Sequence, residues 1–291
     1  MTTLASPQAK RIYKMGRSRP WVSWLTRYGA LVFASIVFLF PFIWIMLAGF
    51  KTPISFLMGE VIFRPVWLNF DELLFSKTSD YLLNFKNSII VGLSSTILVI
   101  VFAILAAYSI QRLKWPVWVV HSLLVWSIIF HMLPPITIVG AWFLMFRAVN
   151  LDNTLFGLAL AHLTVNLPMA IWLMSIFIGE VPKELEEAAR IDGAGTPQII
   201  YYVIGPLVLP GLAATCILVF IFSWNDFAVA LNLTQRATQT VPIAIAKFAE
   251  ENEIRQTMMA AAATLSVIPG LLLLLIGQRF IVRGLIAGSV K

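Results

Sequence analysis

Six long apolar windows dominate the sequence and restrict what it can fold into. They cover residues 28–50, 87–111, 115–146, 153–179, 207–230 and 256–278. Each is long enough for the ~20 residues that an α-helix needs to cross the hydrocarbon core of a bilayer. Only 12% of the residues are charged, against about 25% in a typical soluble domain. The sequence therefore predicts an all-α, polytopic membrane protein with six transmembrane helices.

Lysine and arginine are distributed unequally between the segments that join these windows. Six crossings place both termini on one side of the membrane, and that side carries 13 of the 21 basic residues. Because segments rich in Lys and Arg stay in the cytoplasm, both termini are predicted to be cytoplasmic. The net charge of +7 has the same explanation and does not indicate a nucleic-acid partner. The predicted division is a tail over 1–28, a six-helix domain over 29–280 and a second tail over 281–291.

Prolines and polar side chains interrupt several windows. Pro134-Pro135, Pro168 and Pro269 are predicted to break the third, fourth and sixth windows, with Pro269 acting only as a packing kink. Polar groups at membrane depth usually face the interior of a helix bundle. His131 beside the proline pair and Asn166 beside Pro168 are therefore predicted to line a pathway.

The fifth window ends in a polar cluster that allows two interpretations. It contains Trp224, Asn225 and Asp226. The carboxylate can cap a helix at the interface, with Trp224 in the aromatic belt of the membrane. Alternatively, the three side chains line the outer gate of a pathway.

A charge-dense segment over 182–204 separates the fourth and fifth windows. Its charged residues must lie at a membrane face because hydrocarbon excludes them. Pro182 suits the first turn of a helix, and Gly193 is expected to end that helix with a positive φ. Thr196-Pro197 is expected to cap and begin a second short helix. On the first helix, Leu185, Ala188 and Ala189 are predicted to form a small apolar face.

The same segment carries a family motif. Glu187-Ala188-Ala189, followed after three residues by Gly193, resembles the E-A-A-x-x-x-G loop of the permease subunits of bacterial ABC importers. The family continues with I-x-L-P, where this chain has Val203-Ile204-Gly205-Pro206, so Gly205 departs from the pattern. Trp224-Asn225-Asp226-Phe227 and the end of the chain resemble the carbohydrate branch of these permeases, and the resemblance covers essentially the whole chain.

The resemblance implies a type I ABC importer permease fold in a bacterial plasma (inner) membrane and transport of a sugar or polyol. It implies as partners a second permease subunit, two ATPase subunits that carry ATP and Mg²⁺, and an external binding protein. This chain itself is expected to be non-catalytic and to hold no cofactor. The resemblance makes segment 182–204 the coupling loop that docks on an ATPase subunit. The residues expected to make that contact are Glu184, Glu187, Ala188, Ala189, Asp192, Gly193 and Ala194.

Three further sets of residues follow from the same resemblance. The C-terminal residues Gly288, Ser289, Val290 and Lys291 are expected to reach the ATPase subunits. The outer loop residues Glu250, Glu251 and Asn252 are expected to contact the binding protein. The pathway is expected to involve His131, Asn166, Trp172, Trp224, Asn225 and Asp226.

Several chemistries find no support in the sequence. No G-x-x-x-x-G-K-[ST] phosphate loop is present, so the chain does not bind ATP in that manner. His121, His131 and His162 lack metal-ligand spacing, and no Ser-His-Asp arrangement can be argued from the sequence. Two other classes remain open, an ion-coupled secondary transporter and a membrane scaffold or assembly protein. Asp226 is almost the only charged residue inside a predicted span, and co-purification of an ATPase would separate the importer from both.

Overall fold

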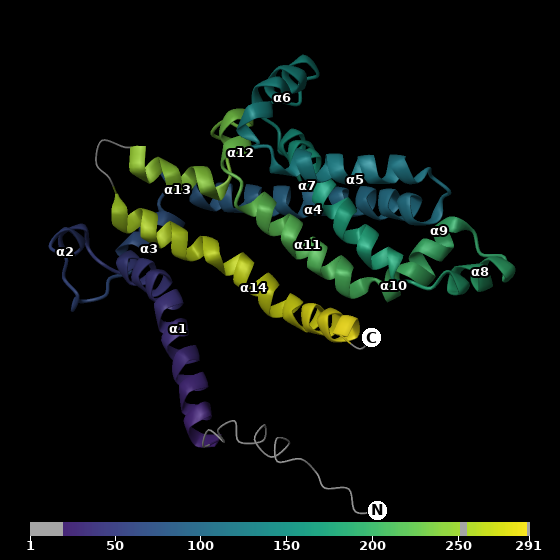
Figure 1. Ribbon diagram of the computed structural model, residues 1–291. Helices are drawn as coiled ribbons and strands as arrows, with labels where there is room; N and C mark the ends of the chain where they lie inside the picture. Colours follow the sequence, from purple (N-terminus) through teal and green to yellow (C-terminus); the bar gives the residue numbers. More distant parts are fainter. Residues whose placement is uncertain (1–19, 251–254, 290–291) are drawn as a thin grey trace, which may run out of the picture.

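The computed structural model describes residues 20–250 and 255–289, and within these ranges every regular element is helical (Figure 1). The outer segments, in the orientation expected from the sequence, contain α2 (Pro53–Leu57), α3 (Leu68–Phe75), α12 (Ala228–Leu233) and α13 (Val241–Glu250). The long helices are α1 (Pro20–Gly49), α4 (Tyr81–Arg112), α5 (Val117–Met132), α6 (Ile136–Ala148), α7 (Leu155–Gly179), α11 (Leu209–Trp224) and α14 (Gln256–Ser289). The inner hairpin is made of α8 (Lys183–Ile191), α9 (Thr196–Gln198), a π-helical turn (Ile199–Ile204) and α10 (Gly205–Leu207).

The predicted all-α membrane fold is confirmed, although two of its six spans are not straight helices. Among the described residues, four helices are long and apolar enough to cross a membrane, namely α1, α4, α7 and α14. The third window is a pair, α5 and α6, bent by 97° at Pro134-Pro135. The fifth belongs to another pair, in which α11 meets the helix over 196–207 at 86°. Counting each bent pair as one span gives up to six.

The expected interruption at Pro168 is wrong, and the packing kink expected at Pro269 stays a prediction. α7 runs without a break through Pro168, and α14 runs through Pro269. A membrane helix tolerates an internal proline when its neighbours satisfy the freed backbone groups. His131 Nδ1 of α5 lies 3.4 Å from the carbonyl oxygen of Val165, in the turn before Pro168.

The ends of the chain are more helical than expected. α1 begins at Pro20, inside the predicted N-terminal tail. α14 continues to Ser289, so the backbone over 281–289 extends the last helix instead of forming a separate tail. Val290, Lys291 and residues 1–19 lie outside the described part of the chain.

The core lies between α4, α7 and α11, and α14 packs against the other side of α11. Small residues on the contact face, such as Ala103 and Ala107 of α4 and Ala170 of α7, are fully buried and let these helices approach closely. Helix α1 stands away from the bundle and meets it only near its C-terminal end (Figure 1). This arrangement leaves the hairpin α8–α10 at one end of the bundle and α2, α3 and α13 at the other.

Candidate functional site

The hairpin at the inner end is closed by Gly193. Its φ is +86°, as the sequence predicted, in the left-handed region that favours glycine. The Gly193 N–H donates to the Arg190 carbonyl at 3.0 Å, and the Ala194 N–H donates to the Ala189 carbonyl at 2.9 Å. No atom lies within 4 Å of the position that a Cβ on Gly193 would occupy. The requirement for glycine is therefore conformational, not a matter of space.

Both short helices begin one residue away from the expected positions. Pro182 is the residue before α8 and not part of its first turn. Gly195, not Thr196, precedes the second helix, and its N–H donates to Gln198 Oε1 at 2.8 Å. Pro197 then occupies the first turn, where its missing N–H costs nothing.

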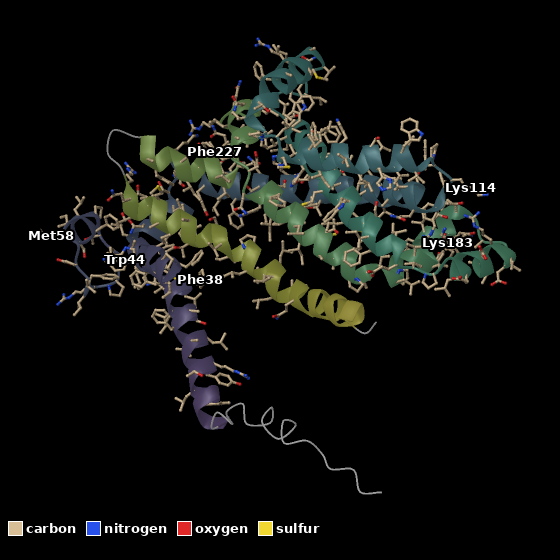
Figure 2. All side chains as sticks on the ribbon, viewed as in Figure 1. Phe38, Trp44, Met58, Lys114, Lys183 and Phe227 are labelled. Carbon is tan, nitrogen blue, oxygen red and sulfur yellow. The ribbon has the colours of Figure 1, made fainter. Side chains whose placement is uncertain are left out.

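One face of α8 is exposed at the tip of the bundle. It carries acidic and small apolar residues, and Ile191 at its end is 86% exposed. Figure 2 places Lys183 of this helix near Lys114, which joins α4 to α5. The exposed members of the expected docking set are Glu184, Glu187, Ala188, Asp192 and Gly193.

Ala189 and Ala194 were also expected in that docking set. Both are partly buried against the protein's own core between α4 and α7. The predicted apolar face of α8 is therefore divided, because Leu185 and Ala188 stay exposed while Ala189 turns inward.

The most buried charge of the hairpin is Glu186, which the sequence did not single out. Its carboxylate accepts hydrogen bonds from Arg112 Nε and from the Tyr108 hydroxyl, both of α4. Arg112 Nη2 also donates to the Ile178 and Val181 carbonyls, at 2.9 and 2.8 Å, at the end of α7. Glu186 lies three residues before Ala189 and therefore on the same face of the helix, but nothing in the sequence shows that this face turns inward.

Gly205, the departure from the family pattern, accompanies the π-helical turn. The Gly205 N–H donates to the Ile200 carbonyl, five residues earlier. A Cβ on Gly205 would lie 3.2 Å from that carbonyl oxygen, closer than ordinary van der Waals contact. Glycine therefore fits the wider turn.

Two of the expected pathway residues share a cavity between α5 and α7. His131 and Trp172 line a space of about 280 Å³ beside Pro168. The His131 ring also packs edge-on against Phe222 of α11, with ring centroids 5.9 Å apart. The lining of this cavity is almost entirely apolar, as in most small-molecule sites, and its Trp172 ring offers an aromatic face.

The other expected pathway residues lie elsewhere. Asn166 is buried and donates to the His162 carbonyl at 2.9 Å, while its own side-chain oxygen has no hydrogen-bond partner among the described residues. Trp224 is buried in the core, where its indole N–H donates to the Ser266 carbonyl at 3.1 Å, so the aromatic-belt interpretation is wrong for this residue. Asn225 is exposed and caps the end of α11 through the Ile221 carbonyl.

Asp226 follows the end of α11 instead of lying within a helix. Its carboxylate accepts the Ala230 N–H at 3.0 Å at the start of α12 and lies 3.2 Å from His162 Nε2. Asp226 is therefore a helix cap, as one of the two interpretations held, but it caps α12. His162 Nδ1 lies 2.6 Å from Ser223 Oγ, which also accepts from Ser95.

The grouping of Ser223, His162 and Asp226 could not be argued from the sequence, because the histidine is about 60 residues away from the other two. Ser223 and His162 are 5% and 2% exposed. None of the three lines any of the described cavities. The cluster joins α4, α7, α11 and α12, and its chemistry is that of a buried structural hydrogen-bond network.

At the outer end the charged pairs are exposed. Arg236 Nε lies 2.6 Å from Asp80 Oδ2, and Arg255 Nη1 lies 3.1 Å from Glu72 Oε1. The hydrogen bond from Arg236 lowers the pKa of Asp80 below its ordinary value. Of the residues expected to meet a binding protein, Glu250 ends α13, and Glu251 and Asn252 lie outside the described residues.

These features place the chain in a defined class. Residues 99–287 match the family of binding-protein-dependent transport system inner membrane components, and the chain belongs to that family. It is a multi-pass membrane protein and a permease component of an ABC importer.

Curated relatives are similar over most of their length. The trehalose transport system permease protein SugB of Mycobacterium tuberculosis is 38% identical over 263 residues, covering 87% of this chain and 92% of that protein. The trehalose/maltose transport system permease protein MalG of Thermococcus litoralis is 33% identical, covering 90% of this chain and 95% of that protein. The sulfoquinovosyl glycerol transport system permease protein SmoH of Agrobacterium fabrum is 31% identical, and the match covers 87% of this chain and 89% of that protein.

A solved structure shares the fold at lower sequence identity. A chain of a bacterial ABC transporter involved in the import of the acidic polysaccharide alginate has a TM-score of 0.75 and 19% identity, covering 96% of this chain and all of that one. A chain of the alginate transporter in complex with a pentasaccharide-bound periplasmic protein has a TM-score of 0.59 and 17% identity, covering 90% of this chain and 96% of that one.

Proposed function

We propose that this chain is a transmembrane subunit that imports a small sugar or glycoside, driven by ATP hydrolysis on separate subunits. The hairpin α8–α10 carries this proposal, because the turn at Gly193 shapes it and its exposed acidic and apolar side chains lie at one end of the bundle. The named relatives handle trehalose, maltose and a glycosyl glycerol, which supports a glycoside as the solute.

The partners of this subunit follow the general arrangement of such importers. Two ATPase subunits bind ATP and Mg²⁺, and one of them docks on α8 through Glu184, Glu187 and Ala188. Charge-assisted bonds from Lys or Arg of the ATPase suit the exposed acids. The end of α14 lies on the same cytoplasmic side, and the contact of the chain's last residues with the ATPase pair is part of this proposal.

A second permease chain covers α1. The apolar window of this helix has none of its residues buried in the lone chain. Figure 2 shows Phe38 and Trp44 on α1, well away from the labelled residues at the hairpin end. ATP-driven closure of the two ATPases moves the hairpins and rocks the two permease bundles, which exposes the pathway to the outside. His131 and Trp172 then meet the solute in the cavity between α5 and α7.

An ATPase assay on the assembled complex tests this proposal. The complex of both permeases and both ATPases is reconstituted with the binding protein, and hydrolysis is measured with disaccharides, polyols and amino acids. We expect stimulation by one or more disaccharides or glycosides. Absence of any co-purifying ATPase, or stimulation by an amino acid alone, would contradict the proposal.

The topology has its own test at the outer loop. A cysteine at Glu251, in a chain with Cys216→Ser, should react with an impermeant thiol reagent added to intact cells. A second cysteine at Lys183 should react only after lysis. The reverse pattern would place the hairpin outside and refute cytoplasmic docking.

A further inference from the structure

Three helical elements meet at the guanidinium of Arg112. The residue lies in the last turn of α4, and its Nη2 caps the Ile178 and Val181 carbonyls at the end of α7. Its Nε donates to the carboxylate of Glu186 in α8. The two side chains are only 7% and 6% exposed. One cation therefore joins the hairpin to both central helices of the bundle.

A second bridge runs beside this pair. The Tyr108 hydroxyl, one turn earlier on α4, donates to the other oxygen of Glu186 at 3.3 Å. Arg190 Nη2, one turn later on α8, donates to the Tyr108 oxygen at 3.1 Å. Each carboxylate oxygen of Glu186 thus has a partner, and the network joins two turns of α4 to two turns of α8.

Such a network does more to fix orientation than to increase stability. A buried ion pair gains little over a well-packed apolar pair, because both charges lose their hydration. It does select one rotation of α8 about its axis. If α8 turned by one residue, Glu186 would lose Arg112 and Glu187 would replace it, so the exposed face would lose Glu187.

The ends of α4 and α7 that this network holds lead to the transport pathway. α7 carries Pro168 and Trp172 at the cavity beside His131. Nearer the middle of α4, the two helices are also tied together through Ser95, Ser223 and His162. A displacement of α8 held at Arg112 must therefore move α4 and α7 as one body.

We propose that Arg112 and Glu186 are positioning residues that transmit the movement of the hairpin to α4 and α7. This inference rests on the proposed docking of an ATPase on α8, and it concerns a different step. Docking uses the exposed face with Glu187, whereas transmission uses the buried face with Glu186. The two neighbouring acids of the sequence therefore have separate roles.

The test compares these two acids in the assembled complex. Glu186→Gln keeps the size of the side chain, removes the charge that Arg112 holds, and replaces one of its two acceptor oxygens with an NH2 donor. Glu187→Gln is the matched control on the exposed face. Three quantities are measured in proteoliposomes, namely recovery of the ATPase subunits with the permease, the rate of ATP hydrolysis, and the amount of solute transported per ATP.

We expect the Glu186→Gln complex to assemble and to hydrolyse ATP, while the amount of solute transported per ATP falls about fivefold or more. A factor of about five is the lower limit of the effects that one site typically has on another in an allosteric protein. Glu187→Gln should instead reduce recovery of the ATPase subunits. A Glu186→Gln complex with normal transport per ATP would overturn the inference and leave the docking proposal intact. If neither variant affected recovery, hydrolysis or transport, both proposals would be refuted.

A second variant keeps the test valid if Glu186→Gln fails to assemble. Tyr108→Phe retains the buried ring and removes only the hydroxyl that bridges Glu186 and Arg190. We expect a smaller fall in solute transported per ATP, with normal recovery of the ATPase subunits. An unchanged ratio would then overturn the inference.

Discussion

The two ends of the bundle use the same charge chemistry in opposite ways. At the inner end Arg112 and Glu186 are almost completely buried, and every hydrogen bond of the pair connects separate helices. At the outer end Arg236 is 77% exposed and Asp80 is 33% exposed in their pair. Because water screens the charges of an exposed ion pair, such a pair contributes little to folding stability. Removing one partner of a buried pair, in contrast, is strongly destabilising. The charged pair that is more costly to break therefore lies at the hairpin end of the bundle.

The largest effect is expected at the turn of the hairpin. Gly193→Val places a β-branched residue at a φ of +86°, a strain of about 1–2 kcal/mol or more. The hairpin should point in a wrong direction, and transport should be lost. Gly193→Asn is the control, because Asn tolerates this region, and should retain most transport. Solute uptake is measured for both variants at matched membrane abundance. Equal transport by Gly193→Val and Gly193→Asn would refute the role of the turn.

Breaking the inner ion pair from the arginine side should be the next largest effect. Arg112→Ala leaves a buried carboxylate and two carbonyls without their donor, at a cost of about 3–5 kcal/mol. The double change Arg112→Met with Glu186→Met should recover most of that stability. Thermal unfolding of the purified complex measures this. A double variant no more stable than Arg112→Ala would mean that the charge of Glu186 is not the source of the cost.

At the outer side of the bundle a smaller loss is expected at Asp226. Asp226→Ala removes the cap of α12 and the partner of His162, and loss of a cap costs about 0.5–2 kcal/mol. Asp226→Asn keeps an acceptor for the Ala230 N–H and should cost less. Thermal unfolding of the two variants checks this order, and the reverse order would show that the charge matters more than the cap.

The smallest effect is expected at the exposed outer pair. Asp80→Asn should leave thermal stability almost unchanged at neutral pH, because its pair with Arg236 is screened. Arg236 holds the pKa of Asp80 below its ordinary value, so this contribution is complete above the unfolded pKa of about 3.9 and disappears as the pH falls through the folded pKa. Wild type and variant should therefore converge in acid. If the difference in thermal stability between wild type and Asp80→Asn grew as the pH fell, the prediction would be contradicted.

The sequence was sufficient for the class of fold and for the turn of the hairpin. Long apolar windows leave few alternatives in a bilayer, and glycine at the end of an amphipathic helix has one dominant use. The angle of 97° between α5 and α6 could not be obtained in this way. Proline marks where a helix can bend, but the packing of its neighbours decides whether it does, as the unbroken α7 at Pro168 demonstrates.

The division of α8 into two faces was also beyond the sequence. Glu184, Glu186 and Glu187 are chemically alike, and only the position of Arg112 at the end of α4 selects which one is buried. The grouping of Ser223, His162 and Asp226 was likewise beyond the sequence. Residues that come together from separate helices have no regular separation in the sequence that would reveal their contact. In both cases the missing information is the rotation of each helix about its own axis.

The isolation of α1 has a consequence for how such a subunit is made. Lipid tails are as apolar as the Leu, Ile and Phe side chains that cover this helix, so exposure to the bilayer costs it little. A newly inserted chain can therefore remain stable in the membrane before assembly, with α1 surrounded by lipid. Joining another chain then exchanges lipid contacts for protein contacts, and the gain comes from closer packing instead of from escape from water. Biogenesis can proceed one subunit at a time, without a partner chain present at the moment of insertion.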